Sequence, residues 1–176
     1  PPAMAPPSTA SPEVINSVIT LFQNSFTVVS QVVNINSGSG ISASANTANV
    51  ISNQANTNSV ANQLGGTVHI LGDSITLAGN SVIQATGING GGTVLVGGDW
   101  QGSNGIYQAQ KVIMEAGASI NVSASQNGDG GMLVLWSDIH DPQSRTVASG
   151  TLMALGGVRG GKGGRIETSG RQLMVD

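Results

Sequence analysis

Glycine pairs followed by short apolar strands recur along the second half of the chain. They appear as GGTVHI from Gly65, GGTVLV from Gly91, GGMLVL from Gly130 and GGRIET from Gly163, with starts 26, 39 and 33 residues apart. Within these stretches the side chains must point alternately to the two faces of a strand. A unit repeated every few tens of residues, and unable to bury its own apolar side chains, indicates a stacked array.

Aligning the glycine pairs predicts which residues stack on one another. Two columns of side chains are expected to face inwards: Val68, Val94, Leu133 and Ile166, and Ile70, Val96, Leu135 and Thr168. The column between them is expected to face outwards: His69, Leu95, Val134 and Glu167. A second register, offset by 37 residues, aligns ITLAGNSVIQA (75–85) with VIMEAGASINV (112–122). Residues 65–176 are therefore predicted to be all-β, a right-handed parallel β-helix of about four coils with three short strands in each.

The first 35 residues follow other patterns. Residues 1–12 hold five of the six prolines, which favours an extended arm. In residues 13–35 the apolar positions recur at steps of 4, 3, 4, 3 and 4: Ile15, Ile19, Phe22, Phe26, Val29 and Val33. This spacing favours an amphipathic helix that caps the first coil. A strand is the alternative, because valine, isoleucine and phenylalanine favour strands.

Residues 36–64 carry no charge and are rich in asparagine, serine and alanine. Asparagine and serine side chains bond to nearby backbone groups and so favour turns. We therefore expect a linker or an irregular coil between the apolar segment and the repeats.

Composition narrows the classes of partner. The net charge of −3 argues against nucleic acid, the chain has no cysteine, and no apolar run is dense enough for a membrane span. The sequence starts at Pro1 without the pattern of a signal peptide, so we expect a processed or partial chain.

The titratable residues of the repeats give weak signals for chemistry. Asp99, Asp129, Asp138 and Asp141 stand singly beside turn residues, and turn formation explains them best. His69 and His140 lie in no metal-binding or catalytic spacing. We expect no catalytic residue, no metal site and no cofactor.

Two insertions distinguish the longer repeats, at Asp99 to Gln110 and at Asp138 to Ser144. They carry or adjoin three of the five aromatic residues, Trp100, Tyr107 and Trp136. Insertions in arrays often gather on one face, which is often the binding face. The sequence predicts that these aromatic side chains share one side of the rod, either as a glycan-binding ridge or as a cover over the flank.

Four stretches carry a resemblance to a known family: GGTVHILGDSITLAGNSVIQATG, GGTVLVGGDWQG, NGDGGMLVLWSD and GGKGGRIETSG. They resemble the repeat region of filamentous-haemagglutinin-type adhesins, the exoproteins of bacterial two-partner secretion. The resemblance covers residues 65–176. No match to the family's amino-terminal secretion domain or to its Asn-Pro motifs is found. The resemblance implies a β-helical shaft, secreted or at the bacterial cell surface, that serves adhesion and has no enzymatic site.

The leading hypothesis is a non-enzymatic, secreted structural or adhesive module whose partner is a surface glycan or a host cell surface. One alternative is a subunit that polymerises head-to-tail into an extracellular filament. The other is a β-helical enzyme that acts on polysaccharide. In the filament, or within a longer precursor, the apolar set of residues 13–35 and the last coil are expected to mediate association: Ile15, Ile19, Phe22, Phe26, Val29, Val33, Ile166 and Leu173.

Overall fold

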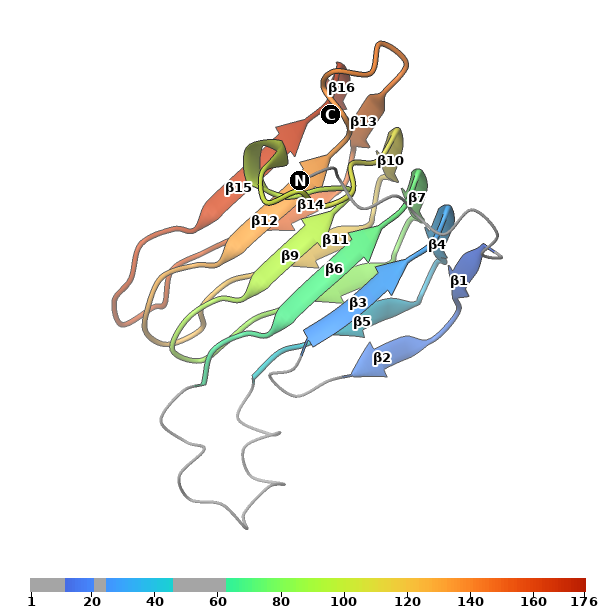
Figure 1. The fold of residues 1–176 in the computed structure, drawn as a ribbon. Coiled ribbons are helices and arrows are strands. Elements are labelled where there is room, and N and C mark those ends of the chain that lie inside the picture. Colours follow the sequence, from blue (N-terminus) through green and yellow to red (C-terminus); the bar gives the residue numbers. More distant parts are fainter. Residues whose placement is uncertain (1–11, 21–24, 46–62) are drawn as a thin grey trace.

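The computed structural model describes residues 12–20, 25–45 and 63–176, which form a parallel β-helix (Figure 1). Three parallel sheets make its sides. Sheet A contains β1 (Glu13–Ile15), β4 (Val32–Ile35), β7 (Ser74–Leu77), β10 (Lys111–Met114), β13 (Arg145–Ala148) and β16 (Gln172–Val175). Sheet B contains β2 (Val18–Thr20), β5 (Gly40–Ser42), β8 (Val82–Gln84), β11 (Ser119–Asn121) and β14 (Thr151–Met153). Sheet C contains β3 (Ser25–Val29), β6 (Thr67–Leu71), β9 (Thr93–Val96), β12 (Met132–Trp136) and β15 (Arg165–Ser169).

The chain visits the sheets in the order A, B, C, and each circuit stacks on the one before it. The three short strands per coil predicted from the repeats are confirmed. The predicted registers are also confirmed: Val94 pairs with Val68 and Leu133, and Leu133 pairs with Ile166. In sheet A, Val112 pairs with Ile75 as the second register predicts.

The interior of the helix is filled by aliphatic side chains. Val68, Val94 and Leu133 form one inward column and have no exposed surface. Ile41, Ile83 and Ile120 form the matching column of sheet B, each at most 1% exposed. Burying such a side chain stabilises the fold by about 1.5–3 kcal/mol. Because each coil covers the one before it, stability is shared along the whole stack.

The predicted capping helix over residues 13–35 is wrong. The segment holds strands β1 and β2, then β3 and β4, and these pair with later coils in the same registers as the rest of the array. The segment forms strands, which was the alternative prediction. The spacing imitated a helix because inward residues of short strands separated by brief turns are also three or four positions apart.

The expected linker at residues 36–64 also contributes to the array. Gly40–Ser42 forms β5, and Ile41 and Ala43 lie in the core. Residues 46–62 of the expected linker lie outside the described residues. The same is true of Phe22 and of the predicted arm, apart from Pro12. The β-helix thus begins well before the first glycine pair.

The glycine pairs occupy the corner between sheets B and C. A Cβ atom on Gly131 would lie 1.8 Å from the carbonyl oxygen of Gly92, and one on Gly92 would lie 2.1 Å from that of Gly66. A Cβ on Gly91 would lie 1.7 Å from the carbonyl oxygen of Val122. Side chains at these positions would push the stacked backbones apart, so the repeat that dominates the sequence is required by close backbone packing.

Among the described residues, no helix has both the length and the apolar character needed to cross a membrane.

Candidate functional site

The first insertion folds back over the outer face of sheet C. We call residues 97–110, between β9 and β10, the flap; it contains the short 3₁₀ helix η2 (Trp100–Gly102). Figure 1 shows this segment in front of strands β9, β12 and β15. Beneath it lie the outward side chains Leu95, Val134 and Trp136, which form a second apolar cluster with Trp100 and Ile106.

Side-chain hydrogen bonds hold the start of the flap in place. Asp99 is buried, and its Oδ1 accepts a hydrogen bond of 2.6 Å from the backbone N–H of Trp100. Its Oδ2 accepts a second hydrogen bond of 2.6 Å from Asn104 Nδ2. Asp99 therefore fixes the turn in which the flap leaves β9, as its interpretation as a turn residue predicted.

The rest of the flap is tied to strands of two later coils. Trp136 Nε1 donates a hydrogen bond of 2.8 Å to Gln108 Oε1, so the buried indole keeps a polar partner. The backbone N–H of Gln101 donates to Glu167 Oε2 at 2.8 Å. The guanidinium carbon of Arg165 lies 5.1 Å from the ring centroid of Trp100, within the range of a cation–π interaction.

Two of the three aromatic residues singled out in the sequence, Trp100 and Trp136, lie on the same side of the rod. Both belong to the apolar cluster over sheet C, as the equivalent insertions predicted. Trp136 is only 3% exposed, whereas Trp100 and Tyr107 are half-buried. The arrangement matches the cover over the flank, and Trp136 offers almost no surface to a ligand.

His69 lies on the same outer face, one coil before Leu95. It is half-buried, and this desolvation lowers its pKa from the ordinary value of 6.5. The charge of Asp99 opposes the shift, because a nearby carboxylate favours the protonated imidazole. The outward direction of His69 was predicted, but its partial burial beside the flap was not.

The other candidate acids also hold turns. Asp138 Oδ1 accepts from the backbone N–H of His140, and Asp141 Oδ1 accepts from that of Gln143, both at 2.9 Å. Asp129 Oδ1 accepts from the backbone N–H of Lys162 at 2.7 Å and so joins two successive coils. Within residues 12–20, 25–45 and 63–176, no three His, Cys, Asp or Glu side chains are placed to hold a metal ion.

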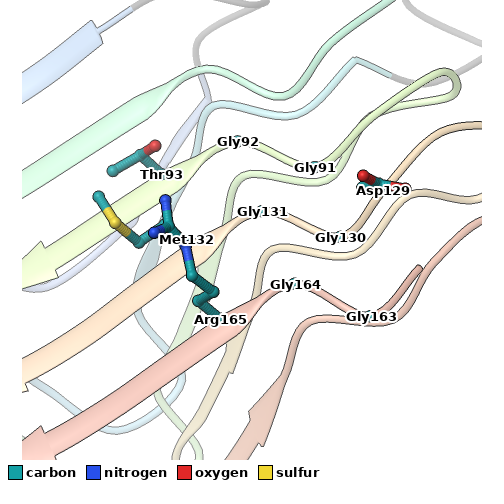
Figure 2. Close-up of a pocket in the computed structure, with 10 residues that line it drawn as sticks. All are labelled: Gly91, Gly92, Thr93, Asp129, Gly130, Gly131, Met132, Gly163, Gly164 and Arg165. Atoms are coloured by element: carbon teal, nitrogen blue, oxygen red, sulfur yellow. The ribbon is translucent and has the colours of Figure 1, made fainter. Parts of the chain in front are cut away.

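A polar hollow of about 360 Å³ lies over the glycine pairs of the last three coils. Figure 2 shows these pairs in a row, with the side chains of Thr93, Met132 and Arg165 on one side of the row and Asp129 on the other. Arg165 thus lies at the boundary between the hollow and the flap, since it also contacts Trp100.

The residues predicted to mediate association are distributed over separate strands. Ile15 and Val33 are buried in the core, and Ile19 and Phe26 pack against it. Val29 is half-buried at the end of β3. Ile166 and Leu173, on the last coil, are 43% and 48% exposed. Ile15, Ile19, Phe26 and Val33 therefore pack in the interior on separate strands instead of forming one shared apolar face.

Comparison with solved structures finds a similar fold in a bacterial protein. The crystal structure of the HMW1 secretion domain from Haemophilus influenzae matches with a TM-score of 0.61 and 27% sequence identity. The match covers 93% of this chain and 45% of that one, so this chain spans less than half of its length. No protein-family model and no curated protein matches the sequence.

This likeness supports the resemblance to two-partner secretion proteins in general terms only. It does not single out the repeat region, which the sequence motifs resembled. The matched structure is instead a secretion domain, for which no motif was found in the sequence. The match covers most of residues 1–64 as well, because it extends over nearly the whole chain.

Several residues that build the flap contacts were not singled out from the sequence. Gln108, Arg165 and Glu167 come from two different coils, and only the position of the flap brings them together. The sequence signal that was available is the register: it places Glu167 in the outward column of Val134 and Leu95, next to the insertion.

Proposed function

We propose that this chain is a secreted, non-enzymatic β-helical module of a haemagglutinin-like bacterial exoprotein, exported by two-partner secretion. The observation that carries the proposal is the likeness to the HMW1 secretion domain over 93% of the chain. The location that follows is extracellular or at the bacterial cell surface.

The arrangement of polar residues supports a structural role over a catalytic one. Asp99, Asp129, Asp138 and Asp141 each accept a hydrogen bond from a backbone N–H, so they stabilise turns and coil stacking. The interior carries aliphatic columns of the kind that build a long rigid rod. A module of this kind presents surfaces for adhesion along its outer faces.

Export is tested by producing the chain, behind a cleavable signal peptide, in a bacterial host with and without a co-expressed outer-membrane transporter of the two-partner secretion type. We expect the folded chain in the medium only when the transporter is present. Val82→Ser, a substitution at an outward and exposed position of sheet B, should be exported in the same way as the parent. Retention in the periplasm despite the transporter, or equal release without it, contradicts the proposal.

Association through the last coil is a second candidate, favoured by its exposed apolar side chains. Ile166, Leu173 and Val175 continue interior columns yet are 43%, 48% and 62% exposed. A polypeptide stacked in register on β15 and β16 would cover them, either as a second copy or as another part of the same protein. Sedimentation of the purified chain over a range of concentrations tests the second-copy form, which predicts head-to-tail polymers. A monomer at every concentration overturns that form.

A further inference from the structure

The hollow over the glycine pairs has a floor formed by glycine backbone and two charged side chains, Arg165 and Asp129, at its sides. Its floor is backbone alone, contributed by Gly91–Gly92, Gly130–Gly131 and Gly163–Gly164. Thr93, Met132 and Arg165 form one wall, and Asp129 stands opposite (Figure 2). The hollow therefore runs across three coils and offers a hydroxyl, a guanidinium and a carboxylate along its length.

Basic residues gather around the last coil, and one of them, Arg165, lines the hollow. The whole chain has six basic residues, and Arg159, Lys162 and Arg165 are all exposed in or just after the loop between β14 and β15. Trp100 orients the guanidinium of Arg165 through their 5.1 Å contact. One oxygen of the Asp129 carboxylate is already engaged, because Oδ1 accepts a hydrogen bond of 2.7 Å from the backbone N–H of Lys162. The side of the hollow at Arg165 is suited to an anionic group.

The backbone of the floor is poorly suited to an added peptide strand. The N–H groups of Gly91 and Gly130 donate to Asp129 and Lys162 carbonyls at 2.9 Å, and that of Gly131 donates to the Val122 carbonyl at 2.7 Å. A peptide that binds by strand addition needs free main-chain donors, and these three are already used. A ligand with many hydroxyl groups of its own can instead bond to side-chain and carbonyl oxygens.

We propose that this hollow binds a chain of carboxylated sugars, with a carboxylate on Arg165 and sugar hydroxyls on Thr93 and Asp129. The ligand lies across the coils, along the row of glycines. The glycines make this close approach feasible, since no side chain rises from the floor. This activity is separate from export, because it concerns the folded chain after release.

The test is calorimetric titration of the purified chain with oligogalacturonate, with its methyl-esterified form as the neutral probe. We expect saturable binding of the acidic form, weakened by added salt because the pair is exposed, and no binding of the ester. Change of the intrinsic fluorescence should accompany binding, since Trp100 contacts Arg165.

Two matched pairs of variants locate the site. Thr93→Phe fills the hollow, whereas Thr67→Phe places the same side chain on its neighbour in the outward column, one coil outside the hollow. Arg165→Gln removes the charge in the hollow, and Arg145→Gln removes one from sheet A. We expect each of Thr93→Phe and Arg165→Gln to weaken binding by about ten-fold or more, the first because it fills the hollow and the second because a charge-assisted contact is lost.

The paired controls should bind like the parent. Circular dichroism of all four variants verifies that the β-helix is retained. The proposal is overturned if the acidic probe does not bind, if the ester binds equally well, or if each variant and its control behave alike.

Discussion

Two adjacent columns of sheet C are both buried, but for different reasons. Val94 and Leu133 point into the helix, where the neighbouring coils of the stack bury them. Leu95 and Val134 point outwards, yet they are only 2% and 0% exposed because the flap covers them. The alternation of a strand thus fixes the direction of a side chain, whereas its burial depends on an insertion elsewhere in the chain.

The comparison predicts that charge is tolerated least in the inward column. Leu133→Asp would bury a carboxylate among aliphatic side chains with no partner for it. We expect a loss of more than about 4 kcal/mol in the free energy of unfolding. His69→Asp, in the outward column and half-buried, should cost much less. Thermal melts of the two variants decide this, and equal losses would mean that the two columns do not differ.

A second prediction compares two glycines of the same corner. Gly131→Ala would place a Cβ 1.8 Å from the Gly92 carbonyl oxygen, so the stacked coils must separate. We expect a loss of about 1–3 kcal/mol from this overpacking. At Gly163 the nearest atom to an added Cβ is 3.7 Å away, and Gly163→Ala should change stability by less than about 0.5 kcal/mol. Denaturant unfolding measures both, and a neutral Gly131→Ala would contradict the role assigned to the glycine pairs.

A third prediction compares the same substitution, valine to alanine, on the inward and outward faces of sheet C. Val94→Ala and Val134→Ala both affect side chains with no exposed surface. Each should cost about 1–2 kcal/mol for the lost apolar burial. We expect the outward variant to cost less, because the flap can settle into the space while the stacked interior cannot.

Shortening the flap should further separate the stability costs of Val94→Ala and Val134→Ala. Replacing residues 100–107 with two glycines should leave the cost of Val94→Ala unchanged and nearly abolish that of Val134→Ala. The parent with the short flap should also bind a hydrophobic dye, since Leu95, Val134 and Trp136 become exposed. Unchanged costs on both faces would show that the flap does not bury the outward column.

Much of the β-helix from Gly65 onwards could be predicted because glycine pairs mark its corners and set the register. The first two coils could not, since no glycine pair precedes Ser25 or Val32 to separate the strands. Inward residues such as Ile15 and Ile19 then lie four apart on different strands and imitate a helical face. The sequence placed Trp100 and Trp136 together but gave no sign that Gln108 and Arg165 would hold them.

The smallest expected effect concerns His69, at the margin of the flap. Its burial lowers the pKa in the folded state below the ordinary value of 6.5. Between the two values the unfolded chain binds more protons than the folded one, so stability rises with pH in that range. The stability that comes from keeping His69 neutral is therefore lost progressively as the pH falls through about 6.5. Asp99 limits the loss, because its charge favours the protonated ring.

The measurement is denaturant unfolding of the parent and of His69→Gln at several values between about pH 7.5 and pH 5. Glutamine does not titrate, so the difference in stability between the two proteins should shift in favour of the variant as the pH falls. With the flap shortened, His69 gains water, its pKa returns towards the ordinary value, and the two proteins should then follow parallel curves. If the curves are already parallel with the flap intact, the outer face of sheet C does not desolvate His69, and the covered region ends at Leu95.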